Sequence, residues 1–240
     1  MNLGIFPARN ARHHPDREAL VFEGQRLTWR ELDARINRSA NALLGLGVTK
    51  GDKVALLLPN TIELVELYWA IAKIGAVAVP LSPLLRGPGL LSLLTDSDAI
   101  ALVTSRGLAG EVERVRDQLT AISAERLLVV DEPGRPGFAD YGALTRSASA
   151  TEPPPSGVVA HDPYNIMYSS GTTGLPKGIV HTHEIRVHYG VHFSGCWRLG
   201  PDSVVLQSGS LVFNGSMLTF IPWMYAGAKL ILHRKFDPSS

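Results

Sequence analysis

Short apolar segments alternate with helical segments along the first half of the chain, and this alternation restricts the fold more than any other feature. The segment KVALLLP at 53–59 is almost continuously apolar and is bounded by turn residues, as in a buried parallel strand. Further strands are expected at 19–22, 26–29, 76–80, 99–104 and 126–130. Strands that alternate with helices in this way predict an α/β fold with layered, mainly parallel sheets flanked by helices.

Two of the intervening helices have clear start or stop signals. Thr28 and Glu31 have the spacing of a capping box, and apolar residues at helical period follow them. Thr61 can cap a second helix, which we expect to end at Gly75. Weaker patterns predict helices near 88–95 and 108–120.

The densest proline lies in the segment 131–163, which has no clear hydrophobic period. We interpret this segment as a long surface connection between two units. The expected organisation is a first α/β subdomain over 1–130 and the start of a second over 164–240. Strands of the second unit are predicted at 165–168, 178–183, 203–207 and 228–233.

Charge and cysteine content exclude several classes of protein. The 23 Lys and Arg residues nearly balance the 22 Asp and Glu residues, so no broad basic field for nucleic acid is present. The single cysteine, Cys196, excludes an internal disulfide framework and fits a reducing compartment. The most apolar segment, 218–232, is too short and too interrupted to span a bilayer. We therefore expect a cytoplasmic protein with no integral membrane segment and no nucleic-acid partner.

The strongest chemical signal is the segment YSSGTTGLPKG at 168–178, which follows a predicted strand. Its glycines allow tight turns and let backbone N–H groups approach a ligand closely. Its hydroxyl groups add hydrogen-bond donors, and Lys177 supplies a positive charge suited to phosphate oxygens. These properties predict a polyphosphate-binding loop. It is not a Walker P-loop, because Pro176 stands where that motif has glycine and neither Ser nor Thr follows Lys177.

This segment resembles the phosphate-binding signature of the adenylate-forming superfamily, which includes acyl-CoA synthetases, peptide-synthetase adenylation domains and luciferases. In that signature a Ser/Thr pair precedes Gly-Ser/Thr-Thr-Gly, any residue and Pro-Lys-Gly, and every element is present here. The segments 27–60, 68–84 and 210–232 resemble other characteristic blocks of the family, in the same order. The resemblance covers nearly the whole chain, and an acyl-CoA synthetase-like ligase is the working hypothesis.

The resemblance implies a two-step reaction. A carboxylate attacks the α-phosphate of Mg-ATP to give an acyl-adenylate and pyrophosphate, and the thiol of coenzyme A then displaces AMP. The implied substrates are a small carboxylic acid, ATP and coenzyme A, with Mg²⁺ accompanying ATP. The sequence does not distinguish fatty, aromatic and short-chain acids, and it does not indicate an oligomeric state.

The resemblance also implies roles for individual residues. Thr172 and Thr173 would be the principal hydroxyl contacts of the β- and γ-phosphates, and Lys177 would offset their charge as pyrophosphate leaves. The whole expected phosphate-binding set is Ser169, Ser170, Gly171, Thr172, Thr173, Gly174 and Lys177. His183, Phe213 and Asn214 are expected neighbours of the acyl or thiol site, although Asn214 stands where the family often has histidine.

Later blocks of the family have no counterpart in these 240 residues. These are the Tyr-Gly-x-Thr-Glu block, whose Glu helps to hold magnesium, and a small C-terminal domain with the catalytic lysine. We therefore expect an incomplete large N-terminal domain that is inactive in ligation by itself, and no catalytic residue is assigned. Two alternatives remain open: a noncatalytic nucleotide-binding or interaction module, and an adenylating enzyme that passes the acyl group to a carrier-protein thiol.

Several other residues have structural interpretations. Four histidines fall within 181–192, but their spacing does not match the zinc-protease pattern, and no metal site is predicted. Cys196 has no partnered base in view and is expected to be a buried packing residue. The expected core aromatic residues are Tyr68, Trp69, Phe220, Trp223 and Tyr225.

Overall fold

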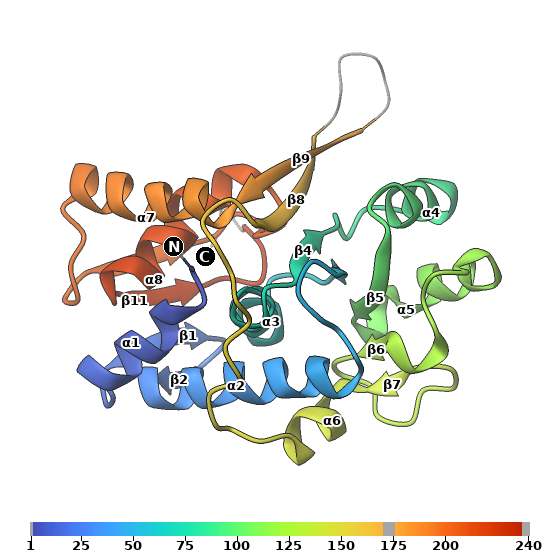
Figure 1. Cartoon of the computed structure of the whole chain (residues 1–240), viewed down its shortest axis with the longest axis horizontal. Coiled ribbons are helices and arrows are strands. Elements are labelled where there is room, and N and C mark those ends of the chain that lie inside the picture. Colours follow the sequence, from blue (N-terminus) through green and yellow to red (C-terminus); the bar gives the residue numbers. More distant parts are fainter. Residues whose placement is uncertain (1, 170–175, 237–240) are drawn as a thin grey trace.

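The computed structural model describes residues 2–169 and 176–236 of the chain (Figure 1). The α-helices are α1 (Ile5–His13), α2 (Trp29–Gly45), α3 (Ile62–Ile74), α4 (Gly87–Asp96), α5 (Arg106–Glu113), α6 (Tyr141–Ser147), α7 (His183–Trp197) and α8 (Met217–Ala226). The strands are β1 (Glu18–Phe22), β2 (Gln25–Thr28), β3 (Lys53–Leu57), β4 (Val77–Pro80), β5 (Ala99–Thr104), β6 (Leu127–Val129), β7 (Ala139–Asp140), β8 (Pro163–Ser169), β9 (Lys177–Thr182), β10 (Val204–Gln207) and β11 (Lys229–Leu232). Short 3₁₀ turns are η1 (Arg116–Gln118), η2 (Ala124–Arg126) and η3 (Asn214–Ser216).

The larger sheet has seven strands in the order β7-β6-β5-β3-β4-β8-β9. Its neighbouring strands are parallel, except that β8 and β9 form an antiparallel hairpin. Helices α3 and α4 lie in the connections that leave β3 and β4. The predicted α/β fold with mainly parallel sheets is confirmed.

Both faces of the larger sheet are covered, which explains the apolar sequence of β3. Val54 and Leu56 belong to a cluster that includes residues of α2 and α3, whereas Ala55 and Leu57 belong to a second cluster with residues of α4 and α5. Successive side chains of a strand point to opposite faces of the sheet. A strand between two helical layers therefore needs apolar residues at every position.

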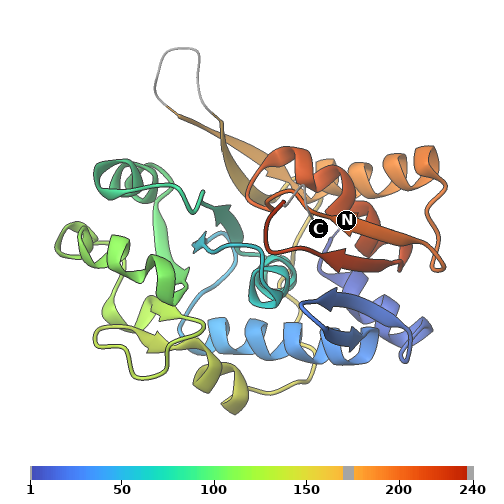
Figure 2. The same cartoon turned by 180° about the vertical axis from the view of Figure 1, so that it is seen from behind.

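The smaller sheet brings together strands from the two ends of the chain. Its order is β10-β11-β1-β2, and β1 pairs in parallel with β11 through Leu20 and Leu230 (Figure 2). In the larger sheet, β8 likewise pairs with β4 through Ala78 and Asn165. Both sheets thus combine strands from before and after the 131–163 connection, so the expected boundaries at 130 and 164 are not sheet boundaries. As limits of two subdomains they remain a prediction.

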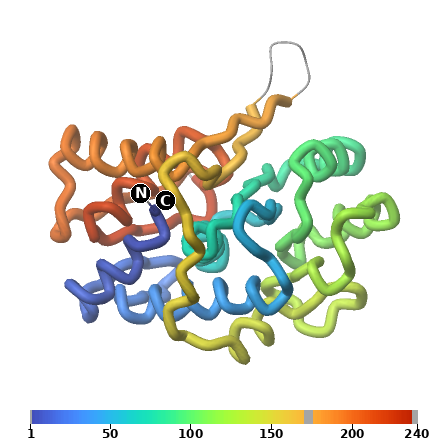
Figure 3. The backbone as a smooth tube through the Cα atoms, viewed as in Figure 1, coloured from blue at the N-terminus to red at the C-terminus, as the bar shows by residue number. Residues whose placement is uncertain are grey.

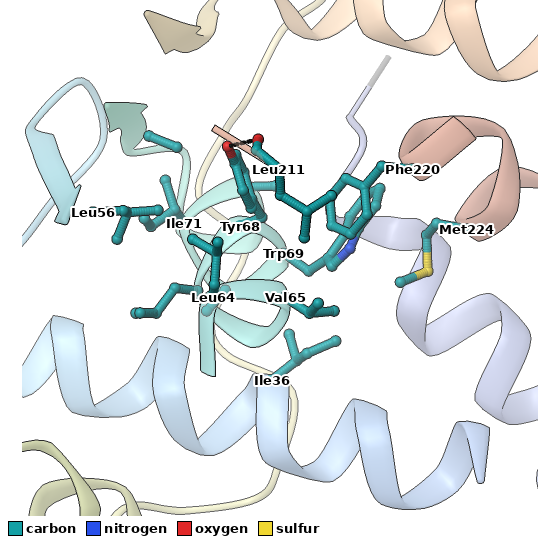
Figure 4. Packing of buried hydrophobic residues seen from close by; sticks show 14 of the residues in the cluster. Ile36, Leu56, Leu64, Val65, Tyr68, Trp69, Ile71, Leu211, Phe220 and Met224 are labelled. Atoms are coloured by element: carbon teal, nitrogen blue, oxygen red, sulfur yellow. Dashed lines mark hydrogen bonds between the residues drawn. The ribbon is translucent and has the colours of Figure 1, made fainter. Parts of the chain in front are cut away.

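Helix α3 is buried on almost all sides and forms the centre of the core (Figure 4). The rings of Tyr68 and Trp69 lie 5.3 and 5.5 Å from the ring of Phe220 on α8. The Tyr68 hydroxyl donates a 2.8 Å hydrogen bond to the carbonyl oxygen of Leu211. The predicted core positions of Tyr68, Trp69, Phe220 and Trp223 are confirmed, whereas Tyr225 is only partly buried. In the described part of the chain, no helix has the length and apolar character needed to cross a membrane.

The predicted helix starts and stops are confirmed. At the start of α2, the Thr28 hydroxyl accepts a hydrogen bond from the N–H of Glu31, whose carboxylate accepts one from the N–H of Thr28. The Thr61 hydroxyl caps α3 by accepting a 3.2 Å hydrogen bond from the N–H of Leu64. Gly75 ends α3 with a φ of 75°, a conformation that favours glycine.

The 131–163 segment contains more regular structure than the sequence predicts. Strand β7 pairs with β6, and Asp140 then caps α6 by accepting a 3.0 Å hydrogen bond from the N–H of Ala143. The sequence did not indicate this helix, because a helix of 7 residues is too short to show a hydrophobic period. The interpretation of 131–163 as a connection between two units remains a prediction. Beyond α6 the chain crosses α2 towards β8 (Figure 3). Glu152, in this part of the chain, accepts a hydrogen bond from the buried ammonium of Lys73 on α3.

Three helices besides α6 differ from the prediction. Helix α5 ends at Glu113 and is followed by η1, rather than continuing to 120. Helices α1 and α8 are not predicted, and α8 contains Pro222, a residue that normally ends a helix. Phe220 and Trp223 are fully buried on α8. Tertiary packing of this kind supplies most of the stability of helices in proteins and here outweighs the proline.

Candidate functional site

The predicted phosphate loop starts and ends at facing positions of the β8–β9 hairpin. Ser169 at the end of β8 and Lys177 at the start of β9 are Cα partners in the antiparallel ladder. The phosphate-binding residues predicted between them, Ser170, Gly171, Thr172, Thr173 and Gly174, lie outside the described residues. Because β8 runs parallel to β4, Ser169 lies at the carboxyl edge of the parallel strands, where open α/β sheets bind ligands.

Tyr168 holds the strand that leads into this loop. Its Cα partner is Gly178, and a Cβ atom on Gly178 would lie 3.3 Å from Cε1 of the Tyr168 ring. The Tyr168 hydroxyl donates a 2.6 Å hydrogen bond to Oδ2 of Asp96 at the end of α4. Burial and the neighbouring carboxylate raise the pKa of Tyr168, so the hydroxyl remains a donor. The end of β8 is thereby tied to α4.

Both described ends of the loop are accessible. Ser169 and Lys177 are exposed, as are the residues of β9 next to Lys177. An exposed ammonium keeps its charge at little cost and is available to an oxyanion. A hydroxyl and an ammonium on facing positions at the carboxyl edge of a parallel sheet can contribute to holding phosphate oxygens.

His183 is the first residue of α7 and is fully buried. Its Nδ1 atom accepts a 3.2 Å hydrogen bond from the N–H of Leu3, which assigns the imidazole proton to Nε2. Nε2 is buried and has no hydrogen-bond partner within residues 2–169 and 176–236. Burial lowers the pKa of His183 to about 4, so the ring is neutral at pH 7. The Tyr164 ring packs beside it at 5.5 Å.

Phe213 and Asn214 lie where the chain enters η3, before α8. Phe213 is 53% exposed, and Asn214 is exposed beside it. The Oδ1 atom of Asn214 accepts a 2.9 Å hydrogen bond from an Nη2 atom of Arg186, one turn after His183 on α7. Through Arg186, the structure links Asn214 to the first turn of α7, the helix that begins with His183.

Sequence reasoning missed Arg186, which is completely buried. The Nε atom of Arg186 donates a 2.9 Å hydrogen bond to Oδ1 of Asn165 on β8, while Nη1 has no partner among the residues that the structure describes. Burial lowers the pKa of Arg186, but an arginine remains charged at pH 7. Arg186 follows His183 by three residues, a spacing that places both side chains on one face of a helix, and that spacing was the available signal.

The remaining histidines and the cysteine are divided between the core and the surface. His181 is buried, and burial lowers its pKa to about 4, whereas His188 is exposed. Cys196 is exposed, with Sγ 3.6 Å from Nε2 of His192, so the expected buried packing role is wrong. Helix α7 has apolar residues on several sides, and its pattern does not reveal which side is buried.

Across residues 2–169 and 176–236, no group of three or more His, Cys, Asp or Glu side chains is arranged to hold a metal ion.

The sequence model for "AMP-binding enzyme" matches residues 7–240. A long-chain-fatty-acid–CoA ligase, FadD13, of Mycobacterium tuberculosis is 37% identical over 185 residues, which cover 76% of this chain and 35% of the ligase. A feruloyl-CoA synthase of an Amycolatopsis species is 34% identical over 239 residues, which cover 99% of this chain and 45% of the synthase. The chain thus spans less than half the length of these two curated relatives.

Solved structures agree with the sequence comparison. The inhibitor-bound N-terminal domain of FACL13 from Mycobacterium tuberculosis superposes with a TM-score of 0.85 at 30% identity. The superposition covers 99% of this chain and 58% of that domain. The predicted resemblance to the N-terminal domain of an acyl-CoA ligase is confirmed.

Proposed function

Because the chain belongs to the AMP-binding enzyme family, we propose that it binds ATP through the Ser169–Lys177 loop and supports the activation of a carboxylic acid. In this proposal Thr172 and Thr173 contact the β- and γ-phosphates, with Ser169, Ser170 and Lys177 nearby. Gly171 and Gly174 let the backbone N–H groups approach the nucleotide. The proposal also places the protein in the cytoplasm, since one cysteine fits a reducing compartment.

The observation that carries the proposal is the position of the loop. Its first and last described residues are partners at the carboxyl edge of the parallel strands, and both are exposed. At the base of the hairpin, Gly178 packs against the Tyr168 ring, and the Tyr168 hydroxyl donates a hydrogen bond to Asp96. These contacts hold the described strand ends on either side of the loop. An anion that binds there meets hydroxyl groups and an accessible ammonium, which favours a polyphosphate over an apolar ligand.

The proposed chemistry has two steps. A carboxylate oxygen of the acid forms a bond to the α-phosphorus of ATP, and the bond from that phosphorus to the bridging oxygen breaks, which releases pyrophosphate. A thiol sulfur then forms a bond to the acyl carbon, and the carbon–oxygen bond to AMP breaks. Lys177 would offset the charge that develops on pyrophosphate as it leaves. Magnesium accompanies ATP in the proposal and supplies charge neutralisation of the phosphates.

Coenzyme A is the proposed thiol acceptor, with a carrier-protein thiol as the alternative. Both curated relatives are named for products or reactions of coenzyme A. Their named acids, a long-chain fatty acid and ferulate, differ in size and polarity, so the relatives support a carboxylic acid without indicating which one.

For these 240 residues alone, we propose ATP binding without acyl transfer. The Tyr-Gly-x-Thr-Glu block and the catalytic lysine of the resemblance do not occur in this sequence. A noncatalytic nucleotide-binding module is therefore the second candidate function for the chain by itself.

The proposal is tested by calorimetric titration of the 240-residue chain with Mg-ATP. Wild type is expected to bind, and Lys177→Met is expected to bind at least about tenfold more weakly, because a charge-assisted hydrogen bond is lost. Lys235→Met is the matched control, since it removes one exposed positive charge at the far end of the chain. Failure of wild type to bind ATP, or equal weakening by both variants, would contradict the proposal.

Pyrophosphate release tests the expected inactivity of these 240 residues by themselves. The chain is mixed with Mg-ATP and a panel of carboxylic acids, and released pyrophosphate is measured. No release above that of a Lys177→Met sample is expected from these 240 residues alone. Release by wild type would contradict the expected inactivity and exclude the noncatalytic module.

A further inference from the structure

Arg186 is a fully buried guanidinium that has no carboxylate partner among the residues the structure describes. Nε and one Nη atom donate to the neutral side-chain amides of Asn165 and Asn214, and the same Nη lies 3.4 Å from the weakly accepting sulfur of Met167. The Tyr189 ring covers one face of the guanidinium at 5.0 Å. Buried charges in proteins are normally paired, so this arrangement leaves a full positive charge only partly compensated.

Several buried polar atoms near Arg186 have no hydrogen-bond partner among the described residues. Nη1 of Arg186 and Nδ2 of Asn165 are donors, whereas Nδ1 of His181, on the Cα partner of Asn165, is a ring nitrogen that can accept. The Tyr164 hydroxyl is also buried without a partner, and burial raises its pKa, so it stays protonated. A ligand that satisfies the donors among these atoms must accept hydrogen bonds. A carboxylate accepts through both oxygens and donates none, which makes it a better match for these donors than water or an amide.

A break in the β8–β9 register places these groups on one side of the sheet. Pro163 pairs with Thr182 and Asn165 with His181, so β8 has one extra residue, Tyr164, between the two pairs. Tyr164 and Met167 both belong to the cluster on the α7 side, whereas Ile166 and Tyr168 pack into the cluster on the other side. Strict alternation would have separated Tyr164 from Met167. Bulges of this kind re-aim side chains and are common beside binding sites.

Asn214 covers Arg186 on the solvent side. Asn214 is exposed on η3, with exposed Phe213 and Gly215 beside it, whereas Arg186 is buried beneath. The Oδ1 atom of Asn214 accepts a hydrogen bond from Nη2 of Arg186. The adjacent Nη1 atom donates to no described residue. A carboxylate bound to the two Nη atoms would replace one neutral acceptor and satisfy the unpartnered atom as well.

We propose that Arg186 and Asn165, beneath Asn214, form a buried site for a second carboxylate of the acid substrate. The inference rests on the proposed function in one respect: that function makes the bound acid a substrate of the protein. A reacting carboxylate loses its negative charge when it becomes an acyl-adenylate, which would leave the buried guanidinium unpaired in the intermediate. A carboxylate that takes no part in the reaction keeps its charge throughout. Arg186 is therefore a specificity-determining residue that favours dicarboxylic acids over monocarboxylic acids.

The test is calorimetric titration of the 240-residue chain with malonate, succinate, glutarate and adipate. The matched monoacids are propionate, butyrate, valerate and hexanoate, and succinamate replaces one carboxylate by an amide. At least one diacid is expected to bind about tenfold or more tightly than its monoacid and amide counterparts, because a bidentate pair with arginine is added. Equal binding of diacids and monoacids, or no saturable diacid binding, overturns the proposal.

Asn214→Asp provides the decisive variant because it alters an exposed side chain that already contacts Arg186. The new carboxylate pairs with the guanidinium and competes with the ligand, so the diacid preference is expected to disappear while the chain melts at an equal or higher temperature. Arg186→Met, of similar length and uncharged, is expected to lose the preference as well. A diacid preference that persists in folded Asn214→Asp overturns the proposal.

Titration with Mg-ATP on the same samples separates this proposal from the proposed function. A chain that prefers diacids but does not bind ATP would contradict the proposed function and retain the carboxylate site. A chain that binds ATP without a diacid preference would contradict only the carboxylate site.

Discussion

Glu66 on α3 is completely enclosed, and its carboxylate accepts a hydrogen bond from Arg35 on α2, whose side chain is 42% exposed. The two residues therefore differ in solvation although they form one ion pair. Burial raises the pKa of Glu66 to about 7, and the attraction of Arg35 offsets this only in part, because water screens the exposed guanidinium. The pair joins the two helices and also makes the free energy of unfolding depend on pH.

Stability is expected to fall with rising pH through the Glu66 carboxylate. Its folded pKa of about 7 lies above the ordinary value of 4.5, so between these values the folded state binds more protons than the unfolded state. This group then lowers the free energy of unfolding as pH rises from about 4.5 to 7, by at most about 3 kcal/mol. Urea unfolding of Glu66→Gln should show a flatter pH profile than wild type. Parallel profiles for the two proteins would show that Glu66 does not titrate in this range.

The His183 imidazole is expected to make the free energy of unfolding fall as pH falls, which is opposite to the effect of Glu66. Burial lowers its folded pKa to about 4, below the ordinary value of 6.5, so its stabilising contribution is complete above 6.5 and is lost as pH falls towards 4. His183→Gln keeps a neutral acceptor near the N–H of Leu3 and should reduce the acid-induced loss of stability. Urea unfolding at several pH values measures the difference, and exposed His188→Gln on the same helix is the control. Identical acid profiles for wild type and His183→Gln would refute the prediction.

Tyr168→Phe is expected to destabilise the chain and to weaken ATP binding slightly. The substitution removes the 2.6 Å hydrogen bond to Asp96, which accepts as a charged group, at a cost of about 1.5–3 kcal/mol. A double-mutant cycle with Asp96→Asn measures the coupling between the two side chains by urea unfolding. Additive effects of the two substitutions would mean that the hydrogen bond does not stabilise the end of β8.

Phe220→Ala is expected to cost about 3–5 kcal/mol, because it leaves a cavity among three buried aromatic rings. The Phe220 ring lies 5.3, 5.5 and 5.5 Å from those of Tyr68, Trp69 and Trp223. Phe236→Ala removes the same group from a residue that is 68% exposed, and it should change stability by less than about 0.5 kcal/mol. Thermal unfolding of both variants makes the comparison. Similar losses in the two variants would contradict the central position of Phe220.

Gly75→Ala and Gly24→Ala separate backbone strain from steric contact. Both glycines have positive φ angles, 75° and 82°, so each alanine should cost about 1–2 kcal/mol. A Cβ atom on residue 75 would also lie 2.7 Å from Cγ2 of Val158, whereas a Cβ on residue 24 meets nothing within 4 Å. Gly75→Ala should therefore destabilise the chain by about 1–3 kcal/mol more than Gly24→Ala. Urea unfolding measures the free energy of unfolding of both variants. Equal decreases in the two variants would show that the Val158 side chain moves away from the new Cβ atom without an energetic cost.

Local signals in the sequence predicted the elements whose causes lie within a few residues. Thr28 and Glu31 are three positions apart, and Gly75 directly follows the last turn of α3. The continuous apolar segment of β3 likewise predicts burial on both faces. The phosphate loop has a pattern specific enough to indicate the family, because its glycines, hydroxyl groups and lysine all lie within residues 168–178 in a fixed order.

Contacts between distant residues decided the rest. The pairing of β1 with β11 joins residues about two hundred positions apart, and no local pattern encodes that partner. Helix α8 forms across Pro222 because Phe220 and Trp223 pack against α3, and local propensity predicts the reverse. The sequence by itself determined the family, the strand and helix periods and the candidate phosphate residues. Only the tertiary structure decided that Arg186 is buried against Asn165 and Asn214, because burial depends on which surfaces of the folded chain meet.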